Sequence, residues 1–260
     1  MSQPVQAPPP ADFIQAAARR EAARERRDAL LDERKRSFLR LASHELRTPL
    51  NSILGFSEII SQELYGPLGA PQYKEYAGII RASGQRLLKL VNQILEIARL
   101  EGHATDLDLR LESIDQALDD VLEGLKDEIA QRRIEIMAPG RGALPLAMAD
   151  PRGLRTILGN LIQNAVAFSP DGGEIRVRAE VDGGWTLISV EDDGPGVDPH
   201  ELPRLLQPFE QGENALTRRS EGAGLGLPIC ELLCRAMGGR LRLRSTPDQG
   251  FTALVWLPPA

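Results

Sequence analysis

Two helix-forming segments separated by a glycine- and proline-rich turn constrain the fold of this chain more than any other feature. The turn is Tyr65-Gly-Pro-Leu-Gly-Ala-Pro71, where glycine and proline make continuation of either helix unfavourable. The sequence from about residue 37 to residue 100 therefore predicts a helical hairpin. Each arm would hold roughly 25 residues and would be about 40 Å long.

The second arm carries an apolar stripe at helical spacing. Its members are Tyr76, Ile80, Leu87, Val91, Ile94 and Ala98. Two isolated helices cannot bury such stripes fully, whereas two copies of the hairpin bury them in a four-helix bundle. The sequence therefore predicts a homodimer formed through residues 37–101.

The segments on either side of the hairpin differ in character. Residues 1–12 are rich in proline and alanine and are predicted to be disordered. Residues 13–36 are rich in alanine, arginine and glutamate, with small or apolar residues every seven positions, which predicts a helical, coiled-coil lead-in to the hairpin. Residues 106–260 alternate strand-like and helix-like runs, which indicates one sheet with helices packed against a face.

Composition and charge exclude some classes of protein. The hydrophobic fraction of 42% is sufficient for a sizeable core, and the formal charge of -6 disfavours a nucleic-acid partner. The arginines between residues 19 and 40 alternate with acidic residues, as on a solvated helix. The sequence has no apolar run of the roughly 20 residues needed to span a bilayer, so we expect a soluble, cytoplasmic chain without a membrane segment.

The two cysteines, Cys230 and Cys234, are one helical turn apart in an apolar run. We expect them to be reduced, buried packing residues. A redox switch or half of a metal site is the alternative, although a metal site would need more ligands than this segment offers.

A histidine that could act as a nucleophile lies in the first arm, within Ser43-His-Glu-Leu-Arg-Thr-Pro49. On a helix His44 and Thr48 share a face, and Pro49 should bend the helix one turn after His44. A neutral imidazole exposes the free ring nitrogen that an attack on phosphorus requires. His103 and His200 have no such setting and are interpreted as structural or surface residues.

The run Phe38-Leu-Arg-Leu-Ala-Ser-His-Glu-Leu-Arg-Thr-Pro-Leu-Asn51 resembles the H box of the HisKA class of sensor histidine kinases. The resemblance implies that His44 accepts the phosphoryl group and that Glu45 orients or deprotonates it. It also implies a phosphatase reaction in which Thr48 places the attacking water. The spacing alone does not assign Glu45, because neighbouring residues on a helix point about 100° apart.

The C-terminal part resembles the ATP-binding domain of the GHKL (Bergerat) type, which is shared by histidine kinases, Hsp90, gyrase and the MutL repair proteins. The segment from Asn160 to Ala165 is similar to the N box, and the resemblance implies that Asn160 and Asn164 contact the nucleotide and that Asn164 holds Mg²⁺. The segment from Val190 to Gly196 is similar to the G1 box. Here Asp192 would accept a hydrogen bond from the adenine amino group, and Gly194 and Gly196 would let the backbone turn against the nucleotide.

Two further motifs follow in the order that the family has. Pro208-Phe-Glu-Gln211, with Phe209, resembles the F box, and Gly222-Ala-Gly-Leu-Gly-Leu227, with Gly222, Gly224 and Gly226, resembles the G2 box. These glycines permit close approach of the backbone to phosphate. The charged segment between the G1 and G2 boxes is where the family has its ATP lid.

The resemblance covers about residues 37–260. It implies a dimeric four-helix bundle followed by an α/β sandwich that binds ATP and Mg²⁺, and a kinase that phosphorylates itself and then the receiver domain of a response regulator. Shorter segments, such as Gly55-Phe-Ser-Glu58, resemble PleC- and DivJ-type kinases of alphaproteobacteria. They are a hint that the partner is a DivK-like single-domain regulator.

Ala167 departs from the family pattern, which commonly has a basic residue at this position of the N box. Either Arg218 or Arg219 replaces that cation at the phosphates, or ATP binds loosely. Two other interpretations stay open at this point. One is a phosphotransfer protein with a degenerate ATP domain, and the other is an ATPase of the Hsp90 or MutL type, which would leave His44 and its hairpin unexplained.

Overall fold

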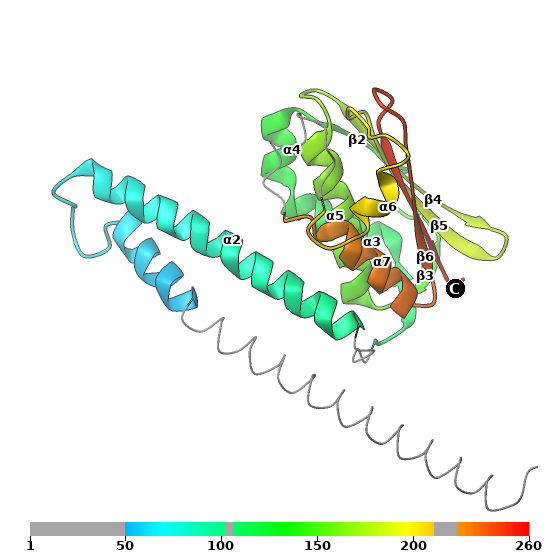
Figure 1. The fold of residues 1–260 in the computed structure, drawn as a ribbon, viewed down its shortest axis with the longest axis horizontal. Coiled ribbons are helices and arrows are strands. Elements are labelled where there is room, and N and C mark those ends of the chain that lie inside the picture. Colours follow the sequence, from blue (N-terminus) through cyan, green and yellow to red (C-terminus); the bar gives the residue numbers. More distant parts are fainter. Residues whose placement is uncertain (1–49, 102–106, 211–222, 260) are drawn as a thin grey trace, which may run out of the picture.

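The chain folds into a helical hairpin followed by an α/β domain (Figure 1). The structure is a computed structural model that describes residues 50–101, 107–210 and 223–259. The fold class expected from the sequence is confirmed for the hairpin and for the α/β domain. The pairing of two hairpins stays a prediction, and the segments 1–12 and 13–36 lie outside the described residues.

The hairpin consists of a helix over residues 50–61 and the longer helix α2 (Pro71–Glu101), which lie side by side (Figure 1). The intervening turn falls where glycine and proline predicted it. Pro71 is the first residue of α2, a position at which proline is tolerated because the N–H group there has no partner within the helix.

The two arms approach closely at a small residue of α2. Gly84 is buried, and a Cβ at this position would lie 2.9 Å from Leu54 Cδ2. The hydroxyl group of Ser57 also donates a hydrogen bond to the carbonyl oxygen of Ala77 in the opposite arm. The hairpin is therefore closed by side-chain packing and by a buried hydrogen bond.

Large apolar side chains of the hairpin are exposed in the single chain. They are Ile53, Phe56, Ile60, Tyr76, Ile79, Ile80, Leu87 and Ile94. The C-terminal end of α2 behaves differently, because Ile97 and Leu100 are buried in the same core cluster as the α/β domain. Helix α2 thus joins the two parts of the chain while its apolar stripe stays uncovered.

The α/β domain is built on a five-stranded sheet with the strand order β2-β4-β5-β7-β6. Its strands are β2 (Glu135–Met137), β4 (Glu174–Asp182), β5 (Trp185–Asp192), β6 (Arg240–Ser245) and β7 (Phe251–Leu257). Strand β2 runs parallel to β4, and all other neighbours are antiparallel. A separate antiparallel pair is formed by β1 (Arg110–Ser113) and β3 (Leu146–Ala149).

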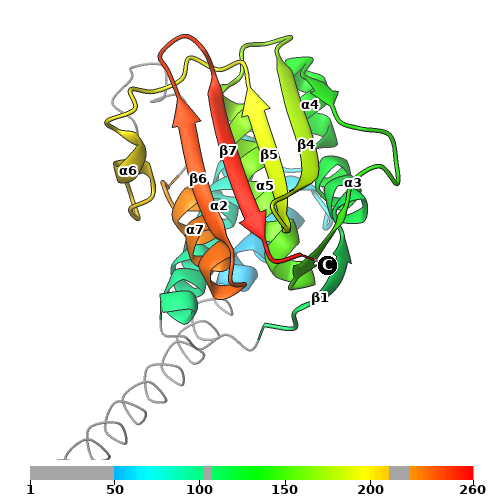
Figure 2. The same ribbon diagram turned by 90° about the vertical axis from the view of Figure 1, so that its right-hand side faces the viewer.

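Helices cover one face of this sheet (Figures 1 and 2). They are α3 (Ile114–Gly124), α5 (Pro151–Phe168) and α7 (Gly226–Ala236), with α5 in contact with both of the others. The shorter helices α4 (Lys126–Arg132) and α6 (Leu202–Leu205) complete the domain. The strands show the alternation of buried and exposed residues that a sheet covered on one face requires.

Helix α5 is specified by its ends and by its apolar face. Asp150 caps its start, with Asp150 Oδ1 accepting a hydrogen bond from Gly153 N–H at 2.7 Å, and Pro151 is the first helical residue. The apolar face is almost fully buried; it consists of Leu154, Ile157, Leu158, Leu161 and Ile162. The other face of α5 is therefore free to carry polar side chains.

The C-terminal end of α5 is held by an arginine from α4. The guanidinium group of Arg132 donates to the carbonyl oxygens of Val166, of Ala167 at 2.8 Å and of Ser169 at 2.7 Å. A cation at this end also interacts favourably with the helix dipole. Arg132 thus fixes the last turn of α5.

Truncation of the α5 core tests this packing. Leu158→Ala should lower the free energy of unfolding of the α/β domain by about 2–5 kcal/mol, because the fully buried side chain leaves a cavity. Urea unfolding followed by tryptophan fluorescence reports on this domain, since both tryptophans, Trp185 and Trp256, lie in its sheet. Val181→Ala, at a position that is 65% exposed, is the matched control, and an equal loss in both variants would contradict the assignment.

Candidate functional site

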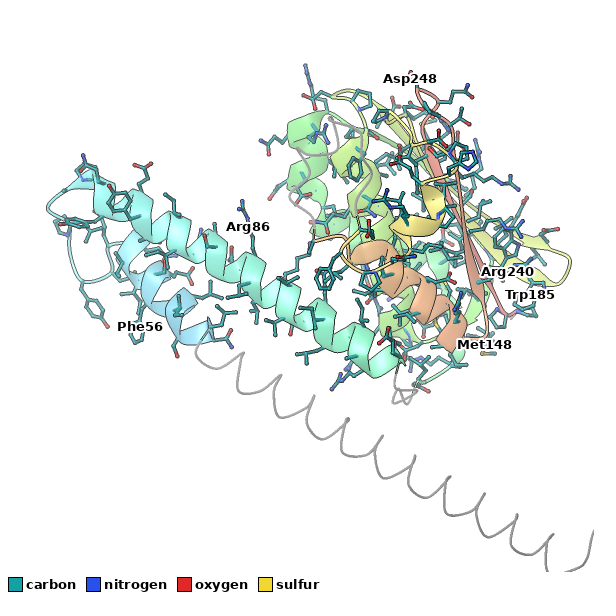
Figure 3. The ribbon with its side chains drawn as sticks, viewed as in Figure 1. Phe56, Arg86, Met148, Trp185, Arg240 and Asp248 are labelled. Carbon is teal, nitrogen blue, oxygen red and sulfur yellow. The ribbon has the colours of Figure 1, made fainter. Side chains whose placement is uncertain are left out.

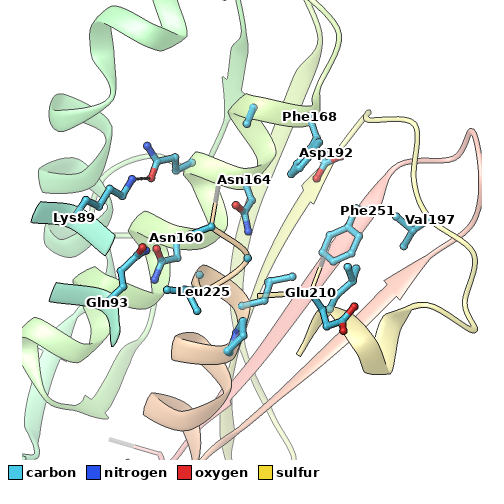
Figure 4. A pocket seen from close by; sticks show the side chains of 18 of the residues that line it. Lys89, Gln93, Asn160, Asn164, Phe168, Asp192, Val197, Glu210, Leu225 and Phe251 are labelled. Carbon is cyan, nitrogen blue, oxygen red and sulfur yellow. Dashed lines mark hydrogen bonds between the residues drawn. The ribbon is translucent and has the colours of Figure 1, made fainter. Parts of the chain in front are cut away.

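A cavity of about 570 Å³ lies between helix α2 and the α/β domain. This volume is within the usual range for sites that bind small molecules. Its walls come from α2, from the polar face of α5, from the end of β5 and from the start of α7 (Figure 4). The cavity is therefore formed by segments from most of the described chain.

A buried carboxylate marks one end of the cavity. Asp192 is the last residue of β5 and is only 6% exposed. Its Oδ1 accepts a hydrogen bond from Gly194 N–H at 2.8 Å, and the aromatic rings of Phe168 and Phe251 lie near it (Figure 4). Burial raises the pKa of Asp192 from 3.8 to about 6, and the hydrogen bond from Gly194 opposes this shift.

The turn after Asp192 requires glycine at two positions. A Cβ at Gly194 would lie 2.6 Å from Asp192 Oδ1. Gly196 has a φ of +62°, and a Cβ there would lie 2.2 Å from the carbonyl oxygen of Thr246. The glycines therefore allow the turn to pack directly against the backbone around it.

Two glycines lie at the start of α7, Gly224 just before it and Gly226 as its first residue. They differ in whether the backbone would tolerate a side chain. Gly224 has a φ of +68°, and a Cβ there would lie 2.6 Å from the carbonyl oxygen of Glu210. At Gly226 a Cβ would meet Asn160 Oδ1 at 3.5 Å, which is an ordinary contact. Only Gly224 of this pair is thus required by the backbone conformation.

The polar face of α5 supplies amide groups to the cavity. Asn160 and Asn164 are one helical turn apart and both line it, together with Gln163 (Figure 4). Amide oxygens of this kind can bind Mg²⁺, and amide N–H groups can donate to phosphate oxygens. The amides lie between α2 on one side and the buried end near Asp192 on the other (Figure 4).

An arginine braces the strand ends that carry Asp192. Arg176 on β4 pairs with Glu174 at 2.9 Å, and with Glu191 and Asp193 at 2.8 Å each. These carboxylates raise the pKa of Arg176 above its ordinary value, chiefly through the hydrogen bonds to Glu191. The two residues that flank Asp192 are thereby fixed, while Asp192 itself faces the cavity.

Comparison with known proteins identifies the two parts of the chain. Residues 34–103 match the family described as His Kinase A (phospho-acceptor) domain, and residues 149–260 match the histidine kinase-, DNA gyrase B- and HSP90-like ATPases. The Caulobacter vibrioides protein named non-motile and phage-resistance protein is 39% identical over 86% of this chain. The cell-division control histidine kinase PdhS of Brucella suis is 34% identical over 93% of this chain. The chain therefore contains a His Kinase A domain followed by a histidine kinase-like ATPase domain.

The chain spans about a quarter of the length of these curated relatives, 27% of the first and 24% of the second. Among solved structures, full-length ShkA in complex with AMPPNP is 36% identical, with a TM-score of 0.72, over 85% of this chain and 45% of that one. The Acinetobacter baumannii histidine kinase AdeS, at 21% identity and a TM-score of 0.58, shares the fold over 83% of this chain and 97% of its own. In the described part of the chain, no helix has the length and apolarity needed to cross a membrane.

The structure brings together most of the residues predicted from the N, G1 and G2 boxes. Asn160, Asn164, Asp192, Gly196, Gly224 and Gly226 line the cavity, and Gly194 donates to Asp192. Phe209 is not among the lining residues. Its side chain is 62% exposed, while its backbone N–H donates to the carbonyl oxygen of Gly224 at 3.1 Å.

Other predicted site residues lie outside the described residues. They are His44, Glu45, Thr48, Arg218, Arg219 and Gly222. Their roles stay predictions, as do the roles of the residues that line the cavity.

Several lining residues were not predicted from the sequence. They are Arg86, Lys89, Leu90 and Gln93 of α2, Glu128, Phe168, Val197, Leu205, Glu210, Leu225 and Phe251. A turn signal at Asp248-Gln-Gly250 could have identified Gly250, where a Cβ would lie 2.0 Å from the carbonyl oxygen of Asp192. Nothing in the local sequence identifies the α2 residues, because they reach the cavity only through tertiary packing.

The cysteines are packing residues of the α/β domain, as expected. Cys230 and Cys234 are free and buried, and burial raises the pKa of the Cys230 thiol to about 12. The described residues contain no group of three or more metal-ligating side chains around them or elsewhere. A thiol held in this way is a poor nucleophile and a poor metal ligand.

The buried carboxylate predicts a particular pH dependence. Because the pKa of Asp192 is raised on folding, the ionised form destabilises the folded domain, and this effect is absent below the unfolded pKa and complete above about pH 6. As pH rises from about 4 to about 7, the wild type should lose about 2 kcal/mol of unfolding free energy relative to Asp192→Asn. Urea unfolding across this range measures the difference. The exposed Asp182→Asn should show no such trend, and a difference that does not change with pH would contradict the raised pKa.

Proposed function

We propose that the chain is the catalytic core of a two-component histidine kinase, which transfers the γ-phosphoryl group of ATP to its own His44 and then to a response-regulator aspartate. One observation carries the proposal: the buried Asp192 carboxylate and the α5 amides line the same cavity. The family match over residues 34–103, which include His44, supports His44 as the acceptor that we propose.

Asp192 is suited to hold the adenine end of the nucleotide. The Asp192 carboxylate accepts hydrogen bonds from the backbone N–H groups of Gly194 and Phe251. Its two oxygens offer about four lone-pair sites, so capacity remains to accept a hydrogen bond from an exocyclic amino group. The apolar side chains of Phe168, Val197 and Phe251 would pack against the base and exclude water. Exclusion of water strengthens the hydrogen bond to Asp192.

Asn160 and Asn164 are suited to the phosphate end. We propose that Asn164 contributes its amide oxygen to Mg²⁺ and that Asn160 orients the phosphates, with Gly224 and Gly226 allowing the backbone to approach them. Bound Mg²⁺ would neutralise the charge that develops on the phosphate oxygens. The cavity volume and its amide-rich wall are compatible with these roles.

His44 would attack the γ-phosphorus in line with the leaving oxygen. A bond forms between a ring nitrogen and phosphorus, the bond between phosphorus and the bridging oxygen breaks, and ADP leaves. Glu45 would take the proton that the imidazole releases. We place this chemistry at the boundary of two domains, a phosphotransfer and dimerisation domain over residues 37–101 and a catalytic domain over residues 106–260, in the cytoplasm, where ATP is available.

The exposed apolar side chains of the hairpin support the proposed partners. A homodimer through residues 37–101 would cover the α2 stripe in a four-helix bundle. A receiver domain would then pack near Leu54, Phe56 and Ile60, of which Phe56 is 68% exposed. The receiver that we propose is a DivK-like single-domain regulator, and relatives of the chain are named cell-division control histidine kinases. Thr48 would place water for the reverse, phosphatase reaction on the same regulator.

Incubation of the purified chain with γ-labelled ATP and Mg²⁺ tests the kinase. The wild type should acquire label that survives base and is lost in acid, as expected of phosphohistidine. His44→Ala should abolish the label, and Asn164→Ala should slow its appearance by about 100-fold or more because the metal loses a ligand. His200→Ala, at an exposed position, should label normally. A folded wild type that acquires no label would contradict the kinase and favour a phosphatase or a relay.

Transfer to a receiver domain tests the docking surface. Phe56→Ala should slow transfer from phosphorylated chain to a DivK-like regulator by about tenfold, since truncation of a central aromatic side chain typically weakens an interface by 1–2 kcal/mol or more. Val181→Ala removes an exposed apolar side chain from the α/β domain and should have no effect. An unchanged transfer rate in a Phe56→Ala variant that still dimerises would exclude this surface.

A further inference from the structure

The charged residues that line the cavity are distributed unevenly between the two parts of the chain. Those of the α/β domain are acidic: Glu128, Asp192 and Glu210. Among the described lining residues, the basic side chains are Arg86 and Lys89, and both belong to helix α2 of the hairpin. Figure 3 shows Arg86 projecting from α2 on the side that faces the α/β domain.

Lys89 lies directly beside the amide wall. Its Nζ donates a hydrogen bond to Gln163 Oε1 at 2.9 Å, and Gln163 is the residue before Asn164 on α5 (Figure 4). At the end of α5 the cavity is lined by the uncharged methyl group of Ala167. The nearby guanidinium group of Arg132 donates to the carbonyl oxygen of Ala167 and is not among the residues that line the cavity. The ammonium group of Lys89 is thus the basic group that contacts the polar face of α5.

The partner of Lys89 distinguishes it from other cations of the same helix. Lys74 pairs with Glu63 at 3.3 Å and Arg81 pairs with Glu58 at 3.5 Å, so carboxylates of the hairpin neutralise both of them. Lys89 instead binds a neutral amide. A cation that faces a cavity and is bound only to an amide can exchange this partner for an anion at little cost.

We propose that Lys89, assisted by Arg86, binds the β- and γ-phosphates of the nucleotide, so that the nucleotide bridges the hairpin and the α/β domain. The proposal rests on the function proposed above, because it assumes that adenine lies at Asp192 and the phosphates at Asn160 and Asn164. Charge-assisted hydrogen bonds to phosphate are stronger than the amide contact that Lys89 makes in this structure. The number of phosphates would then determine how firmly α2 docks on the α/β domain.

Titration calorimetry of the full chain with adenosine, ADP and AMPPNP in the presence of Mg²⁺ tests this bridge. Lys89→Ala should weaken AMPPNP binding by about three- to tenfold, as expected for loss of one charge-assisted contact at an exposed position, and should leave adenosine affinity unchanged. The double variant Arg86→Ala/Lys89→Ala should lose more affinity for AMPPNP than for ADP. Lys89→Arg should retain most of the affinity because it keeps the charge.

Two controls separate the effect of the Lys89 charge from any effect of a substitution on helix α2 or on the contact between Lys89 and Gln163. Arg99→Ala removes an exposed cation of α2 that does not line the cavity and should bind AMPPNP as the wild type does. Gln163→Ala removes the amide partner but keeps the Lys89 charge, and should weaken AMPPNP binding less than Lys89→Ala does.

The outcomes distinguish this inference from the proposed function. If the double variant binds AMPPNP as tightly as the wild type, or loses adenosine affinity to the same extent, the bridge is excluded while the kinase proposal stands. A folded wild type that binds neither adenosine nor AMPPNP would overturn both proposals.

Discussion

The packing of helix α5 on the five-stranded sheet is the interaction on which the rest of the structure depends. Its apolar face, from Leu154 to Ile162, is buried in the core, and this burial fixes the direction of the opposite face. The opposite face carries Asn160, Gln163 and Asn164 to the cavity. Asp150 at one end and Arg132 at the other satisfy the backbone groups that the helix leaves unpaired. The same element therefore stabilises the fold and positions the site.

The site also contains a feature that opposes stability. Asp192 is a buried carboxylate whose pKa is raised to about 6, so its ionised form is held in place at a cost in folding free energy. Glycines at positions 194, 196 and 250 let the backbone close around it without a steric clash. Such a group is tolerated where a ligand needs a dry acceptor, and this agrees with the role that we propose at adenine.

Helix α2 carries one apolar surface that is exposed and one that packs against the α/β domain. Its apolar stripe is exposed in the single chain and suits a second hairpin, whereas its C-terminal residues Ile97 and Leu100 pack into the core of the α/β domain. Between these regions, Arg86 and Lys89 face the cavity. The faces of α2 point in different directions. One helix can therefore contact a second hairpin, the core of the α/β domain and a nucleotide bound in the cavity.

The sequence by itself determined the order of the parts and much of the site. Glycine and proline at residues 65–71 specified the hairpin, because neither residue continues a helix. The spacing of Asn160 and Asn164 placed both on one helix face, and the Asp-Gly-Pro-Gly turn located Asp192 at a strand end. These properties depend only on residues that are close together in the sequence, so the sequence pattern contains them.

Only the tertiary structure decided that α2 lines the cavity together with the α5 amides, how deeply Asp192 is buried, and that Phe209 is exposed. It also brought Lys89 to Gln163, which is 74 residues away along the chain. Contacts of this kind follow from how whole elements pack, and no local pattern of residues encodes them.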